Sequence, residues 1–273
     1  MTPLAIDLYC GLGGWTEGLL AEGYDVIGFD IERHEYGEHR YPAQLVLQDV
    51  LTLHGRQFKD AALIVASPPC QEYSYMAMPW SRAKAIAAEY REGRRDVKKL
   101  TALFDACFRI QREACEAAGR HIPLVVENVR GAIPWVGLSR WNFGSFHLWG
   151  DVPALMPMTK TLKVGDSSSH RCRESIKNTG GSWFAVAHNT SSGHGKNARD
   201  DLVRDYIKGV GLGSILWGQG KDQRHRNDPR NTWSGSTARK AASAMIAKIP
   251  LTLSQHIAWA WKPGRELLKT TFK

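Results

Sequence analysis

The sequence lacks most features that mark secreted, membrane-spanning or metal-binding proteins. Its 273 residues include five cysteines, an odd number, and no CxxC pair, which argues against a disulfide framework and a zinc site. No apolar run is long enough to cross a bilayer, and the first residues have no basic start like that of a signal peptide. We therefore expect free thiols, no metal, no membrane association and a cytoplasmic location.

Acidic residues are outnumbered by basic ones. Lys and Arg total 36 against 27 Asp and Glu, which gives a formal net charge of +9. A basic surface favours a polyanionic partner, because phosphates release counterions when cations replace them. Many basic proteins bind no nucleic acid, so charge alone leaves this point open. The hydrophobic fraction of 43% is typical of a globular protein, and the length suits one large α/β domain or a domain with a smaller lobe.

Apolar strand-like runs alternate with amphipathic helix-like segments in the first half of the chain. This alternation predicts a parallel sheet with right-handed crossovers, and therefore an α/β fold. Helices are predicted at 15–22, where Gly23 is placed to end the helix, and at 96–118. Strands are predicted at 4–9, 24–29, 44–47, 62–66 and 123–126.

Potentially reactive side chains follow four of these strands. Asp30, Asp49, Cys70 and Glu127 each come directly after an apolar run or close to its end. The carboxyl ends of parallel strands meet at one edge of the sheet, where open α/β sheets bind their ligands. We therefore expect the four side chains to gather at this edge.

The first motif is Asp7-Leu-Tyr-Cys-Gly-Leu-Gly-Gly14, between a predicted strand and a predicted helix. Glycines allow a tight turn and a close approach to a ligand, and the helix start offers free N–H groups. Asp30 ends the next strand about twenty residues later, where a nucleoside-binding unit places its ribose acid. The glycine spacing differs from GxGxxG, so a nicotinamide dehydrogenase fits less well. A turn without any ligand is the alternative.

The second and third motifs are Ser67-Pro-Pro-Cys70-Gln71 and Val126-Glu127-Asn128-Val129. A cysteine at a strand end is usually packing material, but two prolines fix the backbone and hold the next side chain in place. Cys70 is therefore the candidate nucleophile, and we expect a thiol whose pKa is lowered. Glu127 is the candidate acid that protonates a substrate ring, although it could instead cap a helix or pair with Arg130.

In their order and spacing, these three motifs resemble the cytosine carbon-5 DNA methyltransferase family, in particular its compact bacterial and phage members, over roughly residues 4–150. The resemblance implies a Rossmann-like S-adenosylmethionine-dependent methyltransferase sheet with a smaller, loop-rich target-recognition lobe. It implies S-adenosylmethionine as cofactor and double-stranded DNA as partner. It also implies that Cys70 adds to carbon 6 of cytosine, that Glu127 acts on ring nitrogen 3, and that carbon 5 receives the methyl group.

The same resemblance assigns residues to the cofactor. They match the family positions that line the methionine, ribose and adenine parts of S-adenosylmethionine. One more is a proline that lies next to both the cofactor and the nucleophile. The methionine positions are Tyr9, Gly11, Gly13 and Gly14, the ribose acid is Asp30, the adenine positions are Ile31, Asp49 and Val50, the shared proline is Pro69, and Leu103 is a looser match.

Two late motifs depart from the family pattern. The usual Gln-x-Arg-x-Arg is broken, and Arg140 is the best candidate for its base- or phosphate-contacting arginine, with a plain surface arginine as the alternative. The Asn of a Gly-Asn pair that precedes Val-Pro is replaced by Ala247, ahead of Ile249-Pro250. This replacement puts the cofactor contact usually made there in doubt.

We expect three regions: a catalytic domain at 1–150, a target-recognition region at 151–236, and C-terminal helices at 237–273 that complete the catalytic domain. In the middle region, phosphate and base contacts are expected from Arg, His, Asn and Ser side chains. Two alternatives stay open, namely the same chemistry on tRNA and a DNA-binding relative without catalysis. The candidates for base and phosphate contacts are His188, Asn189, Ser191, Arg224 and Arg226.

Overall fold

The computed structural model describes residues 2–71, 73, 80–143, 146–156, 240–241, 244 and 247–264. The chain divides into two compact units. The first comprises Met1–Ser74, Glu89–Pro157 and Lys248–Lys273, and the second comprises Tyr75–Ala88 and Met158–Ala247. Helix α2 (Trp80–Arg91) belongs mostly to the second unit. Of the expected target-recognition region, everything beyond residue 156, with its five candidate contact residues, lies outside the described residues.

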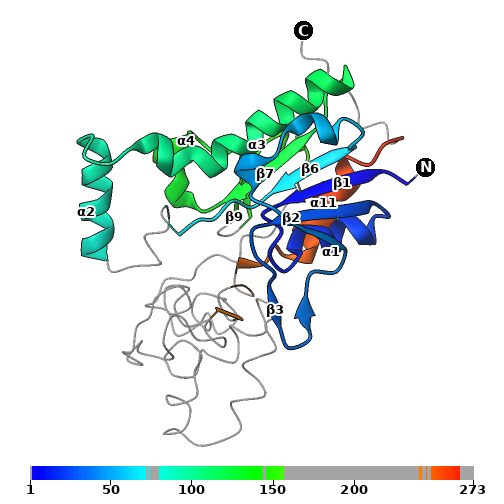
Figure 1. Cartoon of the computed structure of the whole chain (residues 1–273), viewed down its shortest axis with the longest axis horizontal. Coiled ribbons are helices and arrows are strands. Elements are labelled where there is room, and N and C mark those ends of the chain that lie inside the picture. The colour runs from blue at the N-terminus through cyan, green and yellow to red at the C-terminus, as the bar shows by residue number, and fades with distance from the viewer. Residues whose placement is uncertain are drawn as a thin grey trace, which may run out of the picture. The chain divides into compact units, whose positions relative to one another are not determined.

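A seven-stranded sheet forms the centre of the first unit (Figure 1). Its order is β5-β2-β1-β6-β7-β9-β8. The first five strands are parallel, and β9 runs antiparallel to both β7 and β8. The predicted α/β fold is thus confirmed. In sequence order, the strands are β1 (Leu4–Leu8), β2 (Asp25–Asp30), β5 (Gln44–Leu47), β6 (Leu63–Ala66), β7 (Leu124–Asn128), β8 (Trp141–Phe143) and β9 (Phe146–Gly150).

The central strands form because their side chains are buried on both faces. Every residue of β6 and β7 is buried, which explains their continuous apolar runs without alternation. Strands β8 and β9 lie at one end of the sheet and were not predicted. Their sequences mix aromatic, His, Asn and Gly residues, so they have no apolar run that would indicate a strand. A separate hairpin pairs β3 (Glu35–Tyr36) with β4 (His39–Arg40).

Helices cover both faces of the sheet. Figure 1 shows α1 (Gly14–Ala21) and α11 (Leu251–Ala260) on one side and α3 (Val97–Ala118) on the other. Helix α3 begins after Asp96, whose side chain accepts a hydrogen bond from the Lys98 amide, and it ends at Gly119 in a left-handed conformation. Short helical turns follow β5 and β7: η1 (Val50–Thr52), η2 (Gly55–Phe58), η3 (Arg130–Ala132) and α4 (Ile133–Val136).

Helices α1 and α11 pack unusually closely. A Cβ added at Gly18 would lie 2.3 Å from the Gln255 nitrogen, so only glycine permits this approach. The Tyr24 hydroxyl donates to the Ala258 carbonyl at 3.0 Å. Leu253 and Ile257 of α11 join Trp15 in one core cluster. None of the described helices is long and apolar enough to span a bilayer.

Candidate active site

The candidate residues lie at the point in the sheet from which successive strands are added first on one side of β1 and then on the other. Strand β1 has β2 on one side and β6 on the other, so the crevice outside its carboxyl end is the topological switch point of the sheet. The turns after β1 and β6 carry Gly11 and Cys70. Asp30 is the last residue of β2, and Glu127 lies within β7 rather than after it. The prediction that these acids follow their strands was wrong by one or two residues, because strand pairing continues through them.

The glycines of the first turn serve different purposes. An added Cβ would lie 2.5 Å from Pro42 Cδ at Gly13, and 2.4 Å from the Ile249 nitrogen at Gly14. These two glycines therefore allow protein segments to pack against the turn. At Gly11, an added Cβ would meet nothing within 4 Å, so the space over this residue is open. Tyr9, at the start of the turn, has a φ of 57°, a strained conformation for a residue with a side chain.

Asp30 holds the glycine turn from the neighbouring strand. Its Oδ2 accepts the Gly11 amide at 2.9 Å, and its Oδ1 accepts the Glu32 amide at 3.2 Å. Burial opposes ionisation of Asp30, but the His34 ring, whose Nε2 lies 3.6 Å from Oδ1, and the hydrogen bonds from the Gly11 and Glu32 amides outweigh it and lower the pKa of this carboxyl. An ionised carboxylate has about four lone-pair positions, so Asp30 can still accept hydrogen bonds from ligand hydroxyls.

Apolar side chains beside Asp30 are exposed. Ile31 is 74% exposed, and Leu51 is also exposed. Asp49 caps η1 by accepting the Leu51 amide at 2.9 Å, while Val50 is buried. A flat apolar ring could lie against the exposed Ile31 next to Asp30, and the ionised Asp30 suits ribose hydroxyls. The residues present therefore fit the nucleoside part of S-adenosylmethionine.

Tyr9 and Leu103 connect this side of the site to α3. The Tyr9 hydroxyl donates to the Leu103 carbonyl at 2.9 Å. Two carbonyls at and after η1, those of Leu51 and Leu53, accept hydrogen bonds from Arg109 at 3.2 and 2.9 Å. Leu103, the looser match to the family, therefore contacts Tyr9 through its backbone carbonyl.

The turn that carries Cys70 is tied to β7. Pro68 is buried, and its carbonyl accepts the Asn128 side-chain amide at 2.9 Å. The Oδ1 of Asn128 accepts the Val129 amide at 2.8 Å, so both ends of this amide are used. Pro69 is exposed beside Cys70. The hydrogen bonds of Asn128 and the rigid prolines together fix the position of the thiol relative to Glu127.

Cys70 and Glu127 interact electrostatically in a buried setting. Burial and the negative charge of Glu127 raise the pKa of the Cys70 thiol to about 11. Burial also raises the pKa of Glu127, which is only 8% exposed, to about 8, although a hydrogen bond from Ser67 lowers it. The expected low pKa of Cys70 is not found, because no cation lies among the causes of its shift. At neutral pH, both groups are protonated.

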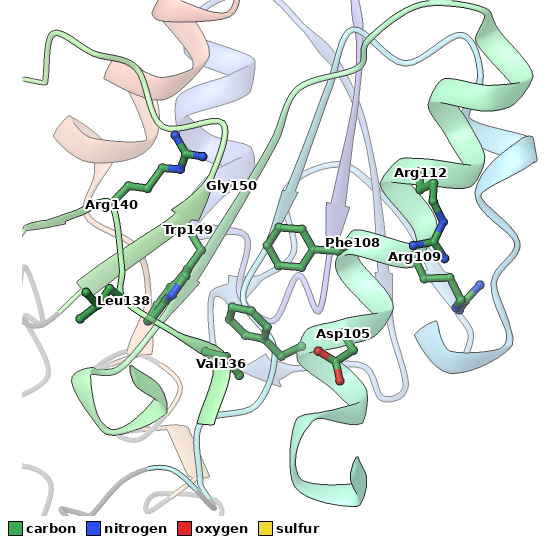
Figure 2. A pocket seen from close by; sticks show the side chains of 10 residues that line it. Asp105, Phe108, Arg109, Arg112, Val136, Leu138, Arg140, Trp149 and Gly150 are labelled. Atoms are coloured by element: carbon green, nitrogen blue, oxygen red, sulfur yellow. The ribbon is translucent and has the colours of Figure 1, made fainter. Parts of the chain in front are cut away.

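Arg140 lies in a different cleft. Its backbone amide donates to the Leu148 carbonyl at 2.8 Å, and its side chain is exposed. Figure 2 shows Arg140 and Trp149 across from Arg109 and Arg112 of α3. This cleft has a volume of about 570 Å³, and neither Cys70 nor Glu127 lines it. The structure therefore does not group Arg140 with the thiol–acid pair.

Sequence reasoning missed the contribution of Ser67 and Trp15. The Trp15 indole N–H donates to the Ser67 hydroxyl at 2.9 Å, and Ser67 lowers the pKa of Glu127 against the effect of burial. A hydroxyl residue directly before the two prolines was the available signal. Its partners could not be read from the sequence, because they lie on two other elements.

Comparison with known proteins supports the resemblance that the motifs indicated. Residues 4–100 match the family model of the C-5 cytosine-specific DNA methylases. The match includes the glycine turn and Cys70, but not Glu127, and the resemblance to this family is thereby confirmed. No curated protein matches the chain in sequence.

Solved structures that match part of the chain include a protein described as a DNA modification methyltransferase encoded within a prophage, from E. coli. It is 22% identical, covers 48% of this chain and 33% of its own, and has a TM-score of 0.32. The S. pombe Dnmt2 methyltransferase is 17% identical, covers 50% of this chain and 37% of its own, and has a TM-score of 0.31. The chain thus spans little more than a third of the length of either protein.

Proposed function

We propose that this chain transfers a methyl group from S-adenosylmethionine to carbon 5 of cytosine in duplex DNA, with Cys70 as covalent nucleophile. One observation carries the proposal: a proline-stiffened thiol and a buried acid interact at the carboxyl edge of the sheet, beside a glycine turn held by an ionised carboxylate. The family match over residues 4–100 supports it.

The cofactor would lie along the carboxyl ends of β1 and β2. Gly11 leaves room for it, Asp30 would accept its ribose hydroxyls, and the exposed Ile31 would cover its adenine. In this proposal Tyr9, Asp49, Val50, Pro69 and Leu103 would surround it as the family resemblance implies, and Gly13 and Gly14 would shape the turn through packing. When bound, S-adenosylmethionine supplies an electrophilic methyl group.

The chain's own residues would activate the ring. The Cys70 thiol would give its proton to solvent water as its sulfur forms a bond to carbon 6, while neutral Glu127 donates its proton to N3, so the ring does not accumulate negative charge. Carbon 5 would then be nucleophilic and take the methyl group, and Glu127 would take the N3 proton back. Transfer of the carbon 5 proton to water and departure of Cys70 as thiolate would restore the double bond. The raised pKa of Glu127 suits this role, because the acid still holds its proton at neutral pH.

The target carbon is hidden in a base stack, so the cytosine has to leave the duplex to reach the half-buried thiol. The net charge of +9 suits the phosphates on either side of the flipped base. Within this proposal, residues 151–236 recognise the target, residues 237–273 complete the catalytic domain, and Arg140 contacts base or phosphate. RNA as acceptor and a non-catalytic DNA-binding protein are the competing functions.

A transfer assay with methyl-labelled cofactor tests the proposal. Duplex DNA is expected to be labelled and tRNA is not, and Cys70→Ser is expected to remove the labelling. DNA that contains 5-fluorocytosine is expected to trap a covalent complex, since fluorine cannot leave as a proton does. Labelling of tRNA alone would favour the RNA reading, and labelling that persists in Cys70→Ser would reject the nucleophile.

A further inference from the structure

Two side chains of α3, Arg109 and Glu113, hold the segment that follows β5. The Arg109 guanidinium donates to the Leu51 carbonyl at 3.2 Å and to the Leu53 carbonyl at 2.9 Å. The Glu113 carboxylate accepts the Gly55 amide at 2.6 Å. These three backbone groups span the end of η1 and the start of η2. We call this arrangement, two side chains of one helix that bind three backbone groups of one segment, the α3 clasp.

The two clasp side chains also pair with each other. Arg109 Nη1 lies 3.0 Å from a Glu113 carboxylate oxygen, at i and i+4 along α3. With the basic residue first, this order is the weaker one for stabilising a helix, so the pair adds little to α3 itself. Desolvation opposes ionisation of Glu113, but the Gly55 amide and Arg109 outweigh it and lower the pKa of its carboxyl. Both charges are therefore present at neutral pH, and each keeps the other in position to bind the segment.

The segment lies directly against α3. A Cβ added at Gly55 would lie 2.0 Å from the Ile110 carbonyl oxygen and 2.8 Å from Glu113 Cβ, so a larger residue would push the segment away. Carbonyls at a helix end lack partners within the helix. Those of Leu51 and Leu53 find theirs in a guanidinium, whose planar fork presents several donors in fixed directions. The clasp therefore gives the segment one position relative to α3.

The held segment borders the Asp30 side of the candidate site. Strand β5 pairs with β2, and the Gln48 amide directly after β5 donates to the Asp30 carbonyl at 2.8 Å. Helix η1 follows at once, capped by Asp49. Helix α3 is tied to the glycine turn as well, because the Tyr9 hydroxyl donates to the Leu103 carbonyl. One helix thus holds chain segments on both sides of Asp30.

We propose that Arg109 and Glu113 are positioning residues for the nucleoside part of S-adenosylmethionine, and that they act through Asp49 and Val50 of the segment they hold. This inference rests on the proposed function, in which those two residues and Asp30 surround the nucleoside. The clasp side chains would not touch the ligand. They would hold η1 in the position that the ligand requires, so that binding does not have to order the segment at a cost in affinity.

The proposal predicts a loss of affinity without a loss of rate. The turn that carries Cys70 is fixed by other contacts, since Asn128 of β7 donates to the Pro68 carbonyl. At saturating cofactor, kcat should therefore stay unchanged when the clasp is broken. A pair needed only for folding would instead lower the urea midpoint and the fraction of protein that binds, and the Kd of the folded molecules would stay the same.

Three variants of the full chain break the clasp in steps. Arg109→Gln removes the forked donors, Arg109→Lys retains the charge on a single nitrogen, and Glu113→Gln retains an acceptor for the Gly55 amide without the charge. Arg112→Gln is the matched control, because it changes an exposed arginine of the same helix. Each protein is titrated calorimetrically with S-adenosylmethionine and with adenosine, which lacks the methionine part. Hydrogen exchange of residues 48–56 and kcat at saturating cofactor are measured in parallel.

For Arg109→Gln, we expect the Kd of both ligands to rise about tenfold, with faster hydrogen exchange in residues 48–56 and unchanged kcat. Arg109→Lys and Glu113→Gln should raise both Kd values about threefold, and Arg112→Gln should match the wild type. The calorimetric stoichiometry reports the folded fraction in each case. An unchanged Kd in Arg109→Gln, an equal rise in Arg112→Gln, or a rise for S-adenosylmethionine without one for adenosine would overturn the proposal.

The same titrations separate this proposal from the proposed function. If the wild type binds both ligands and the variants lose affinity as expected, but neither DNA nor tRNA is methylated, the proposed function fails and the role of the clasp stands. If the wild type methylates DNA and the clasp variants bind the cofactor normally, the role of the clasp fails alone. If the wild type binds neither ligand, both fail.

Discussion

Two acids at the same edge of one sheet are held in opposite protonation states. Asp30, at the end of β2, has a lowered pKa and stays ionised, whereas Glu127, in β7, has a raised pKa and keeps its proton at neutral pH. Both side chains are buried, so burial alone does not explain the difference. Their polar surroundings do: two amides donate to Asp30 and the His34 ring nitrogen lies 3.6 Å from it, whereas at Glu127 Ser67 opposes the effect of burial and does not outweigh it.

The comparison divides the site into two regions. On the Asp30 side, amide and imidazole donors favour a fixed negative charge, which suits the binding of hydroxyl groups. On the Glu127 side, the nearest reactive neighbour is a thiol, which offers no compensating charge and itself becomes harder to ionise. The first region is therefore suited to hold a ligand, and the second to move protons.

Removal of the thiol should produce the largest effect on activity. It should abolish the chemistry of the Glu127 side and leave ligand binding on the Asp30 side unchanged. In Cys70→Ser, methyl transfer is expected to fall by roughly a thousandfold or more, because a hydroxyl is a much weaker nucleophile. Cofactor affinity, measured by titration calorimetry, should stay at the wild-type value. A parallel loss of cofactor binding would show that the two regions are not independent.

Asp7, in β1 between the two regions, is a third acid whose protonation state can be measured. It is fully buried, its Oδ2 accepts the Thr16 hydroxyl at 2.6 Å, and burial raises its pKa to about 7. The folded state therefore holds this proton above pH 3.8, where the unfolded chain releases it, and stability falls as pH rises from about 4 to 7. Between pH 5 and 8, Asp7 accounts for a loss of roughly 3 kcal/mol.

Asp7→Asn should remove that part of the pH dependence. Urea unfolding at pH 5 and pH 8 measures it as the difference between two free energies of unfolding. Asp60→Asn, which changes an exposed acid, is the control and should retain the wild-type slope. An unchanged slope in Asp7→Asn would mean that Asp7 is ionised in the folded protein.

Neutralising Asp30 should weaken the region that holds a fixed charge. Asp30→Asn is expected to lower S-adenosylmethionine affinity roughly tenfold to a hundredfold, because hydrogen bonds to a charged group contribute about 1.5–3 kcal/mol. The loss should appear in Kd and KM, with kcat at saturating cofactor nearly unchanged. Asp25→Asn, at the other, exposed end of the same strand, should bind normally. A fall in kcat alone would reverse the assignment of the two regions.

The smallest expected effect concerns the alkylation rate of the Cys70 thiol in the protein without substrate, measured in Glu127→Gln. Above about pH 8, ionised Glu127 raises the pKa of the thiol, so its removal should speed alkylation at pH 9 several-fold. At pH 7, Glu127 already carries its proton, and wild type and variant should react alike. Peptide mass spectrometry reads each thiol separately, and Cys115 is the internal control. Equal rates at both pH values would contradict the electrostatic link.

The sequence was informative where local patterns decide structure. The continuous apolar runs placed the five parallel strands to within one or two residues, and the helix predicted at 96–118 matches α3. The prolines before Cys70 correctly indicated a stiff turn at a strand end. Strands β8 and β9 were missed, since their mixed composition has no strand signal of its own and they form by pairing with β7.

The amino-acid order by itself determined the α/β fold, the sheet edge that gathers the reactive groups, and the resemblance carried by three motifs. Those properties depend on periodicity and on residues adjacent in the chain. Only the tertiary structure decided that Gly13 and Gly14 serve packing, that Arg140 lies in another cleft, and that the Trp15 indole donates to Ser67. It also decided the protonation states of Asp30, Cys70 and Glu127, because a pKa depends on burial and on donors contributed by distant segments.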